Sequence, residues 1–228
     1  MNNSKRWLAF ILLSAAASAW ALDLSDLSNK DAVAGLKQAL TDGASVAVKQ
    51  LGVKDGFFAN PQVKIPLPAS LQKVESMLKM VGMQQQVDDL DLAMNRAAET
   101  AVADAKPLLM DAVKQMTVQD AKNILTGGDT AATDYFRAKT ADPLAKKFLP
   151  TVKKATAKVG LAAKYNAVAG QAAQFGLVDK NQATIEQYVT SKALDGLYTM
   201  IGEQEKAIRA NPAQAASSLV KKVFGALQ

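Results

Sequence analysis

The sequence contains no cysteine and no histidine. Without cysteine, the chain has no disulfides, no thiol catalysis and no cysteine-ligated iron–sulfur cluster. Without histidine, it lacks the commonest general base, the Ser-His-Asp triad and most types of zinc site. We therefore expect no cofactor and no metal centre. Any catalysis would have to use carboxylates, lysine, tyrosine or a hydroxyl group.

Aromatic residues are also scarce, at 6% of the chain, whereas alanine is abundant. This composition favours closely packed helices over a sheet-rich fold. Apolar residues make up 49% and charged residues 21% of the chain, as in globular proteins. A length of 228 residues is enough for one full hydrophobic core or two small ones.

The first residues differ in character from the rest. Asn2–Arg6 is a short basic head, Trp7–Ala17 is apolar, and Ala19-Trp20-Ala21 has the small-x-small pattern of a cleavage site. This pattern predicts a secretory signal peptide over residues 1–21. A membrane anchor is the alternative, but it needs about 20 apolar residues, more than this run provides. We expect export to the periplasm and no transmembrane segment in the mature chain.

The formal charge of +6 falls to +4 when Lys5 and Arg6 leave with the signal peptide. A mild positive excess spread along the chain is weak evidence for an anionic partner. No aromatic residues alternate with the paired lysines as they do in a strand-binding groove, so we expect no nucleic-acid partner. Asp88, Asp89 and Asp91 lack the spacing of a calcium loop, and they are expected to be a solvated helix start.

Apolar residues recur at three- and four-residue spacing almost everywhere and alternate almost nowhere. The exception is Val63–Leu67, which alternates before its prolines and is expected to be extended, at a sheet edge or as a strap across helices. Asp142-Pro143 is typical of a helix start, and Pro150 of a bend. The sequence predicts an all-α fold: a single multi-helix, bundle-like domain over 22–228 with at most one short extended segment near 63–67.

A glycine corner connects two predicted helices between Thr117 and Arg137. Thr117 and Asp120 have the spacing of a capping box at the start of the first helix. Gly127 and Gly128 are expected to end that helix, with Gly127 in the left-handed conformation. The second helix would be capped by Asp129 or by Thr130.

The corner has two interpretations. The amides from Gly127 to Thr130 could bind a phosphate or carboxylate at the helix start. The candidate binding residues are Thr130, Thr133, Tyr135 and Arg137. However, the spacing is not that of a phosphate-binding loop, and Asp129 would repel an anion. We favour a tight structural turn formed by Gly127, Gly128 and Asp129.

Polar residues interrupt an otherwise apolar helical pattern at Asn95, Arg96 and Glu99, a second candidate binding set. Arg96 and Glu99, three residues apart, are expected to form an ion pair, and a buried polar site is the alternative.

Two further groups of charged and polar residues lie on later helices. Lys192, Asp195 and Tyr198 share one side of a helix, as a minimal acid–base set or as an ion pair with aromatic packing. Glu205 and Arg209 are interpreted as a surface pair.

Several segments together resemble a family of exported bacterial helical proteins of unknown function. They are LSNKDAVAGLKQAL (27–40), FFANPQVKIPLP (57–68), NRAAE (95–99), DAKNILTGGDTAATDYFR (120–137), KALDGLYTMIGEQEKAIRANP (192–212) and KKVFG (221–225). The resemblance covers nearly the whole mature chain. It implies an envelope address and a single domain, and it carries over no catalytic or binding residue.

Three hypotheses about function follow. The first is a non-enzymatic, soluble periplasmic protein that binds an envelope protein through a surface or groove. The second is a carrier of a small apolar or amphipathic ligand between helices. The third is an enzyme that uses carboxylates and lysine. A pocket of several hundred Å3 lined by methionine and leucine would favour the carrier, whereas an exposed apolar patch without a pocket would favour a protein partner. The oligomeric state stays open.

Overall fold

The fold is all-α, which confirms the prediction from hydrophobic spacing. A computed structural model describes residues 29–174, 176, 179, 182–215 and 217–226. The predicted signal peptide lies outside these residues. No strand is present in the described part of the chain. The helices are α1 (Asn29–Leu51), α2 (Ala69–Leu78), α3 (Gln84–Ala103), α4 (Lys106–Gln115), α5 (Val118–Leu125), α6 (Ala131–Thr156), α7 (Gly160–Gln174), α8 (Ile185–Ala210) and α9 (Ser218–Gly225), with a π-helical turn η2 (Lys79–Met83) and a 3-10 turn η4 (Pro212–Gln214).

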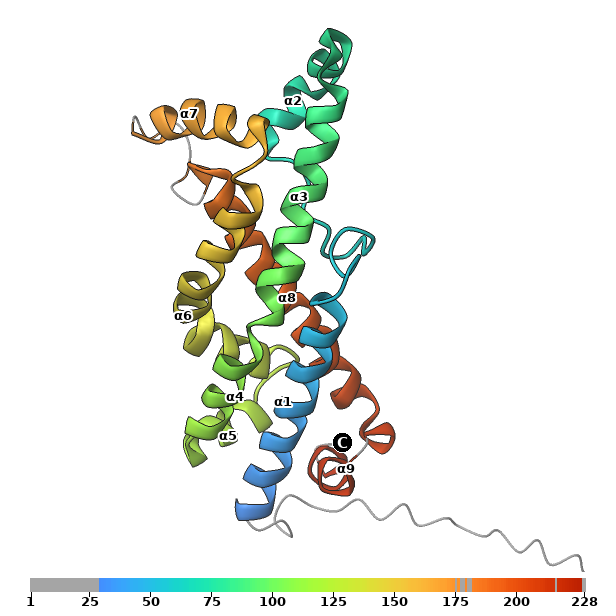
Figure 1. The fold of residues 1–228 in the computed structure, drawn as a ribbon. Helices are drawn as coiled ribbons and strands as arrows, with labels where there is room; N and C mark the ends of the chain where they lie inside the picture. The colour runs from blue at the N-terminus through green and yellow to red at the C-terminus, as the bar shows by residue number, and fades with distance from the viewer. Residues whose placement is uncertain (1–28, 175, 177–178, 180–181, 216, 227–228) are drawn as a thin grey trace, which may run out of the picture.

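The core lies where α1, α3, α6 and α8 pack together. In Figure 1, α3 runs from the upper end of the molecule to its middle, with α6 and α8 beside it and α1 extending from there toward the lower end. Each of these helices contributes fully buried apolar side chains, such as Leu36, Met94, Phe148 and Leu197. Burying one such side chain contributes roughly 1.5–3 kcal/mol, so this helical packing stabilises the fold. Around the core, α4 and α5 pack on α1 and α6, α9 packs on α1, and α7 contacts α3 and α8.

Residues 64–68 belong to no helix or strand, and with Val63 they form a strap across helices, the second of the two predicted alternatives. Ile65 hydrogen bonds to Asn95 of α3, and the Pro66 carbonyl oxygen accepts from Tyr188 of α8. Val63, Ile65 and Leu67 are buried, whereas Lys64 and Pro66 between them are exposed. The alternation of apolar and polar residues therefore marks a strap whose inner side faces the core.

The interpretation of Asp142-Pro143 as a helix start is wrong, because Pro143 and Pro150 both lie inside α6. A proline in a helix interior costs about 3 kcal/mol, since it removes an amide donor and crowds the preceding turn. Phe136, Leu144 and Phe148 are completely buried along the same helix. The burial of these three side chains offsets the cost of the prolines.

Residues 69–83, which form α2 and η2, make up an arm at one end of the molecule. In Figure 1 the arm stands beside and beyond the upper end of α3. No residue of α2 or η2 is buried, although seven of the fifteen are leucine, valine or methionine. The arm turns at Gly82, which has a φ of +82°. The arm is thus an apolar element with little covering it.

Candidate functional site

The first helix of the glycine corner begins as predicted. The Thr117 hydroxyl accepts a hydrogen bond from the Asp120 amide at 3.0 Å, and the Asp120 carboxylate accepts from the Thr117 amide at 3.0 Å. This reciprocal capping box confirms the sequence interpretation. The hydrogen bond from the Thr117 amide, and then that from its hydroxyl, lower the pKa of Asp120 below its ordinary value.

Gly127 does not adopt the predicted left-handed conformation. The described glycines with positive φ are Gly82 and Gly176. Instead, a Cβ atom on Gly127 would lie 2.6 Å from the Ala131 Cβ and 2.7 Å from the Asn123 carbonyl oxygen. Glycine is therefore required at the corner by the close approach of the two helices, and the chain turns there without positive φ.

Neither of the two predicted caps holds the start of α6. Thr130 is in the cap position, but its side chain makes no capping hydrogen bond and its hydroxyl instead donates to Asp134 at 3.1 Å. Asp129 is exposed and makes no hydrogen bond within the described residues. The prediction of a local cap is therefore wrong.

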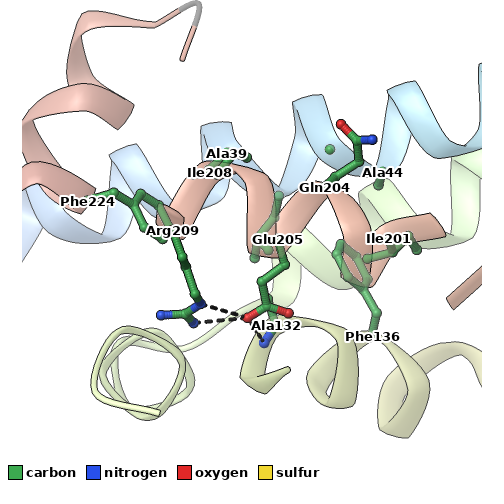
Figure 2. A pocket seen from close by; sticks show the side chains of 12 residues that line it. Ala39, Ala44, Ala132, Phe136, Ile201, Gln204, Glu205, Ile208, Arg209 and Phe224 are labelled. Atoms are coloured by element: carbon green, nitrogen blue, oxygen red, sulfur yellow. Dashed lines mark hydrogen bonds and ion pairs between the residues drawn. The ribbon is translucent and has the colours of Figure 1, made fainter. Parts of the chain in front are cut away.

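The α6 amides bind a carboxylate from α8 instead. Glu205 accepts hydrogen bonds from the amides of Ala132 and Thr133, each at 2.9 Å, and from the Thr133 hydroxyl at 2.9 Å. Arg209 donates to the same carboxylate at 2.9 Å and to the carbonyl oxygen of Ile124 at 2.8 Å (Figure 2). Glu205 is thus the cap of α6, supplied by a different helix.

The interpretation of Glu205 and Arg209 as a surface pair is therefore wrong. Only 5% of the Glu205 side chain and 14% of the Arg209 side chain are exposed. A positively polarised helix start, two amides and a guanidinium together stabilise the buried charge. The cavity beside Glu205 in Figure 2 has a volume of about 20 Å3, which leaves room for little more than one water molecule.

The structure does not bring the four corner candidates together. Thr133 binds Glu205, and the hydroxyl of Tyr135 donates to the Ala112 carbonyl oxygen at 2.8 Å. Thr130 and Arg137 are exposed. The Arg137 guanidinium lies over the ring of Tyr198 at 4.6 Å and 3.5 Å from the Asp195 carboxylate. The amides of the corner hold a carboxylate of the protein itself, and the remaining candidates point to other partners.

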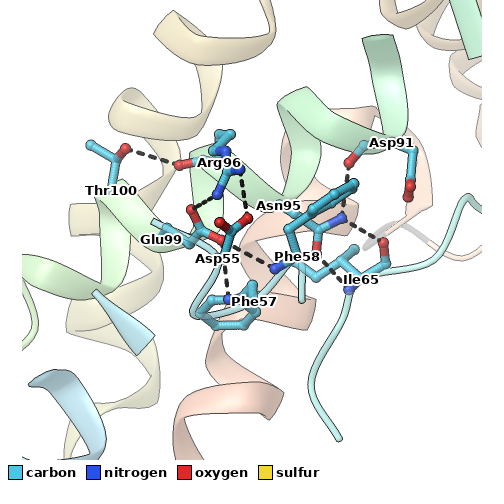
Figure 3. Close-up of polar contacts among 9 residues, drawn as sticks. All are labelled: Asp55, Phe57, Phe58, Ile65, Asp91, Asn95, Arg96, Glu99 and Thr100. Atoms are coloured by element: carbon cyan, nitrogen blue, oxygen red, sulfur yellow. Dashed lines mark hydrogen bonds and ion pairs between the residues drawn. The ribbon is translucent and has the colours of Figure 1, made fainter. Parts of the chain in front are cut away.

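The second candidate set fastens the strap to α3, as Figure 3 shows. The completely buried Asn95 accepts from the Ile65 amide at 2.8 Å and donates to the Ile65 carbonyl oxygen at 3.0 Å. Glu99 accepts from the amides of Phe57 and Phe58, both at 3.1 Å. Strap and loop amides that have no helical partner are thus satisfied by α3 side chains.

Arg96 completes this arrangement. Its guanidinium contacts Glu99 at 2.7 Å, which confirms the predicted pair, and it also contacts Asp55 at 2.7 Å. The Phe58 ring lies below two cations, with the Arg96 guanidinium at 5.5 Å and the Lys64 ammonium at 4.6 Å. Asn95, Arg96 and Glu99 all bind the strap or the loop that precedes it. Together these three residues form a structural clamp on α3.

Lys192, Asp195 and Tyr198 are placed as an ion pair beside an aromatic side chain. The Lys192 ammonium lies 3.6 Å from the Asp195 carboxylate. The Tyr198 hydroxyl is buried and shares a 2.9 Å hydrogen bond with Thr140. Burial raises the pKa of Tyr198. A buried phenol paired with Thr140 does not open toward a substrate, which favours the ion-pair interpretation. Within the described residues, no group of three or more acidic side chains converges as metal ligands do.

An apolar groove that sequence reasoning did not locate lies between the arm and α7. It offers about 490 Å3 of space. Most of its lining side chains are apolar, among them Leu71, Val74, Leu78, Met83, Leu161 and Val168. The signal in the sequence was the dense set of leucine, valine and methionine in residues 69–83, whose helical spacing is the same as that of core residues.

The comparisons give a family and no activity. The family described as "Protein of unknown function (DUF4197)" matches residues 26–225. The chain belongs to this family. Membership of DUF4197 agrees with the resemblance seen in the sequence, and it leaves the function unknown. A search of curated proteins and a search of solved structures each returned no match. The function of this DUF4197 protein therefore has to be inferred from the geometry of the groove and of the buried polar residues.

Proposed function

We propose that this DUF4197 protein is an exported, non-enzymatic binding protein that holds a small apolar or amphipathic ligand in the groove between the arm and α7. The groove itself carries the proposal. Its volume of about 490 Å3 lies within the range of roughly 300–1,000 Å3 that is usual for small-molecule sites. It also meets the criterion set for a carrier, a space of several hundred Å3 lined by leucine and methionine.

The chemistry of the lining supports an apolar ligand. Leucine and valine side chains from α2 face those from α7, and Met83 adds a flexible side chain that adapts to ligands of different shape. An alkyl chain entering this groove would remove both its own surface and that of the walls from water. Each buried methylene contributes about 0.8 kcal/mol, so a chain of ordinary length would bind measurably.

The buried carboxylates support a non-enzymatic role. Glu99 and Glu205 each accept backbone amides and each pair with an arginine of their own helix. Both groups therefore hold segments of the fold together. Neither lines the groove between the arm and α7. No carboxylate is among the described residues that line the groove.

Export remains part of the proposal. The basic head, the short apolar run and Ala19-Trp20-Ala21 support cleavage after Ala21 and a periplasmic location. Among the described helices, none combines the length and apolarity needed to cross a membrane. N-terminal sequencing of the protein from a periplasmic extract is expected to begin at Leu22. Intact Met1 in the membrane fraction would show an anchored protein instead.

A second candidate function is docking of an envelope protein. The tip of the arm, formed by Met77, Met80 and Val81, favours it. Met77, Met80 and Val81 are 60%, 81% and 67% exposed. Exposed apolar side chains that lie together are typical of protein-binding surfaces. These three residues do not line the groove, so the two functions depend on different side chains.

Titration with the neutral fluorescent probe N-phenyl-1-naphthylamine tests the carrier function. We expect saturable binding by the chain and at least about tenfold weaker binding by Val168→Asp, because a carboxylate in the groove must be desolvated when the probe enters. Val168 is 72% exposed, so the substitution should leave folding intact.

The matched control is Val118→Asp on α5, where the valine is 52% exposed and lies outside the groove. It should bind the probe like the parent. Equal weakening by both variants, or no saturable binding by the parent, would contradict the carrier. Met80→Gln, at the tip, is expected to leave probe binding unchanged, and a loss there would favour a site at the tip.

A further inference from the structure

We infer that the ligand of the groove is an anionic amphiphile, an alkyl chain with one negatively charged head group that pairs with Lys164. This inference rests on the proposed function and specifies the chemistry of its ligand. The same chemistry is presented by a free long-chain carboxylate and by the head group of an anionic lipid.

Lys164 has a distinctive place in the groove. It is the one charged residue among the described side chains that line the space. Leu161, Lys164 and Val168 fall on the same side of α7, at i, i+3 and i+7, so the lysine lies within the apolar stripe. Lys164 is exposed and makes no ion pair or hydrogen bond with any described residue. A cation without a partner among the described residues thus lies along an apolar binding surface.

A lysine in this position suits an amphiphile. Its four methylene groups lie along apolar surface while the ammonium remains in water at the rim. The alkyl chain of a ligand would then pack in the groove, with its head group at the rim beside the ammonium. A carboxylate, sulfate or phosphate would gain a charge-assisted hydrogen bond there. A quaternary ammonium head group would instead be repelled.

The charges of both walls favour an anion as well. The arm carries Lys73, Lys79 and Glu75, and α7 carries Lys164 as its one charged residue. Glu75 pairs with Lys79 at 2.7 Å, so the single carboxylate of these two elements is already neutralised. The hydroxyl of Tyr165, which also lines the groove, is occupied because it donates to the Gln182 carbonyl oxygen at 2.8 Å. Lys164 is therefore the charged side chain of the groove that can pair with an anionic head group.

Calorimetric titration of the purified chain with three ligands of equal chain length tests this inference: dodecanoate and dodecyltrimethylammonium, each below its micellar concentration, and 1-dodecanol below its solubility limit. Dodecanoate is expected to bind about fivefold more tightly than dodecanol, the gain of one partly exposed ion pair, and the cationic ligand more weakly than either. Lys164→Gln should remove the preference for dodecanoate. Lys158→Gln should preserve it, because that exposed lysine precedes α7 and does not line the groove.

The outcomes distinguish the proposed carrier function from the inferred anionic class of the ligand. If all three ligands bind equally and Lys164→Gln changes nothing, the anionic class is overturned while the carrier stands. If none of the three binds and the protein does not bind phosphatidylglycerol vesicles either, both are overturned. Co-sedimentation with phosphatidylglycerol vesicles, compared with phosphatidylcholine vesicles, is the lipid arm. Lys164-dependent binding to the anionic vesicles without binding of dodecanoate would assign the same chemistry to a lipid head group.

Discussion

Glu205 caps helix α6 through Thr133, whose amide and hydroxyl both donate to the same carboxylate oxygen at 2.9 Å. The two residues lie 72 positions apart in the sequence. Because α8 supplies the cap, the start of α6 is fixed by tertiary contact, and the glycine corner does not depend on a local cap. Glu99 likewise accepts hydrogen bonds from backbone amides that are distant in the sequence, those of Phe57 and Phe58. Buried glutamates thus fasten two separate parts of the chain.

Removing the Glu205 carboxylate should strongly destabilise the protein. Glu205→Ala leaves two buried amides without their acceptor and removes the carboxylate that pairs with Arg209, and we expect a loss of about 3 kcal/mol in the free energy of unfolding. Glu203→Ala is the matched control, since 44% of the Glu203 side chain is exposed and it pairs with Lys206 at 3.3 Å. It should cost less than about 0.5 kcal/mol. Urea unfolding followed by circular dichroism measures both, and equal costs would contradict the assigned role of Glu205.

The capping box and the Glu205 cap show which contacts can be predicted from sequence. Thr117 and Asp120 are three residues apart, so their pairing follows from helix geometry alone. Glu205 and Arg209 also have the spacing of a helical pair, but the same spacing occurs on exposed and on buried faces. Only tertiary packing shows that this pair is buried and that its third partner is the start of α6.

Other parts of the fold also divide into features that follow from local sequence and features that depend on tertiary packing. The helical period of the apolar residues predicted the all-α class, and the alternation over 63–67 predicted the strap. The continuity of α6 through Pro143 could not be predicted, because the burial that offsets the proline involves other helices. The groove was missed because Leu71, Leu78 and their neighbours have the same spacing as core residues.

The glycine corner makes a second prediction. Gly127→Ala places a Cβ atom 2.7 Å from the Asn123 carbonyl oxygen, a fixed backbone atom, and should cost about 1–3 kcal/mol. Gly128→Ala is the control, since a Cβ there meets nothing within 4 Å and the backbone has no positive φ. It should change stability by less than about 0.5 kcal/mol. Thermal melts in which Gly128→Ala is the more damaging of the two would contradict the packing at this corner.

The strap makes a third prediction. Asn95→Ala removes the partner of both the amide and the carbonyl oxygen of Ile65, which is itself buried, and should cost about 3 kcal/mol. Asn123→Ala is the matched change, because Asn123 is exposed and, within the described residues, its side chain accepts one hydrogen bond, from Gln119. We expect the second variant to unfold like the parent. Hydrogen exchange should also show faster exchange at Ile65 in the first variant, and unchanged protection there would count against the clamp.

The capping box makes a prediction about pH. Hydrogen bonds from Thr117 lower the pKa of Asp120 in the folded protein below the ordinary value of 3.8. The ionised form therefore adds stability above that ordinary value, and this stability is lost as the pH falls through the lowered folded pKa. Asp120→Asn should be less stable than the parent near neutral pH, and the difference should shrink as the pH falls below about 4. A difference that stays constant in acid would show that Asp120 does not cap by its charge.

The central claim is that the groove between the arm and α7 carries an amphiphile, and native mass spectrometry of the protein purified from its own cell envelope tests it most directly. We expect the mass of residues 22–228 together with a noncovalently bound anionic amphiphile that is released on activation. The same preparation of Val168→Asp should give the bare chain. The claim would be contradicted if the parent protein carried no small molecule, or if the bound molecule persisted unchanged in the Val168→Asp protein.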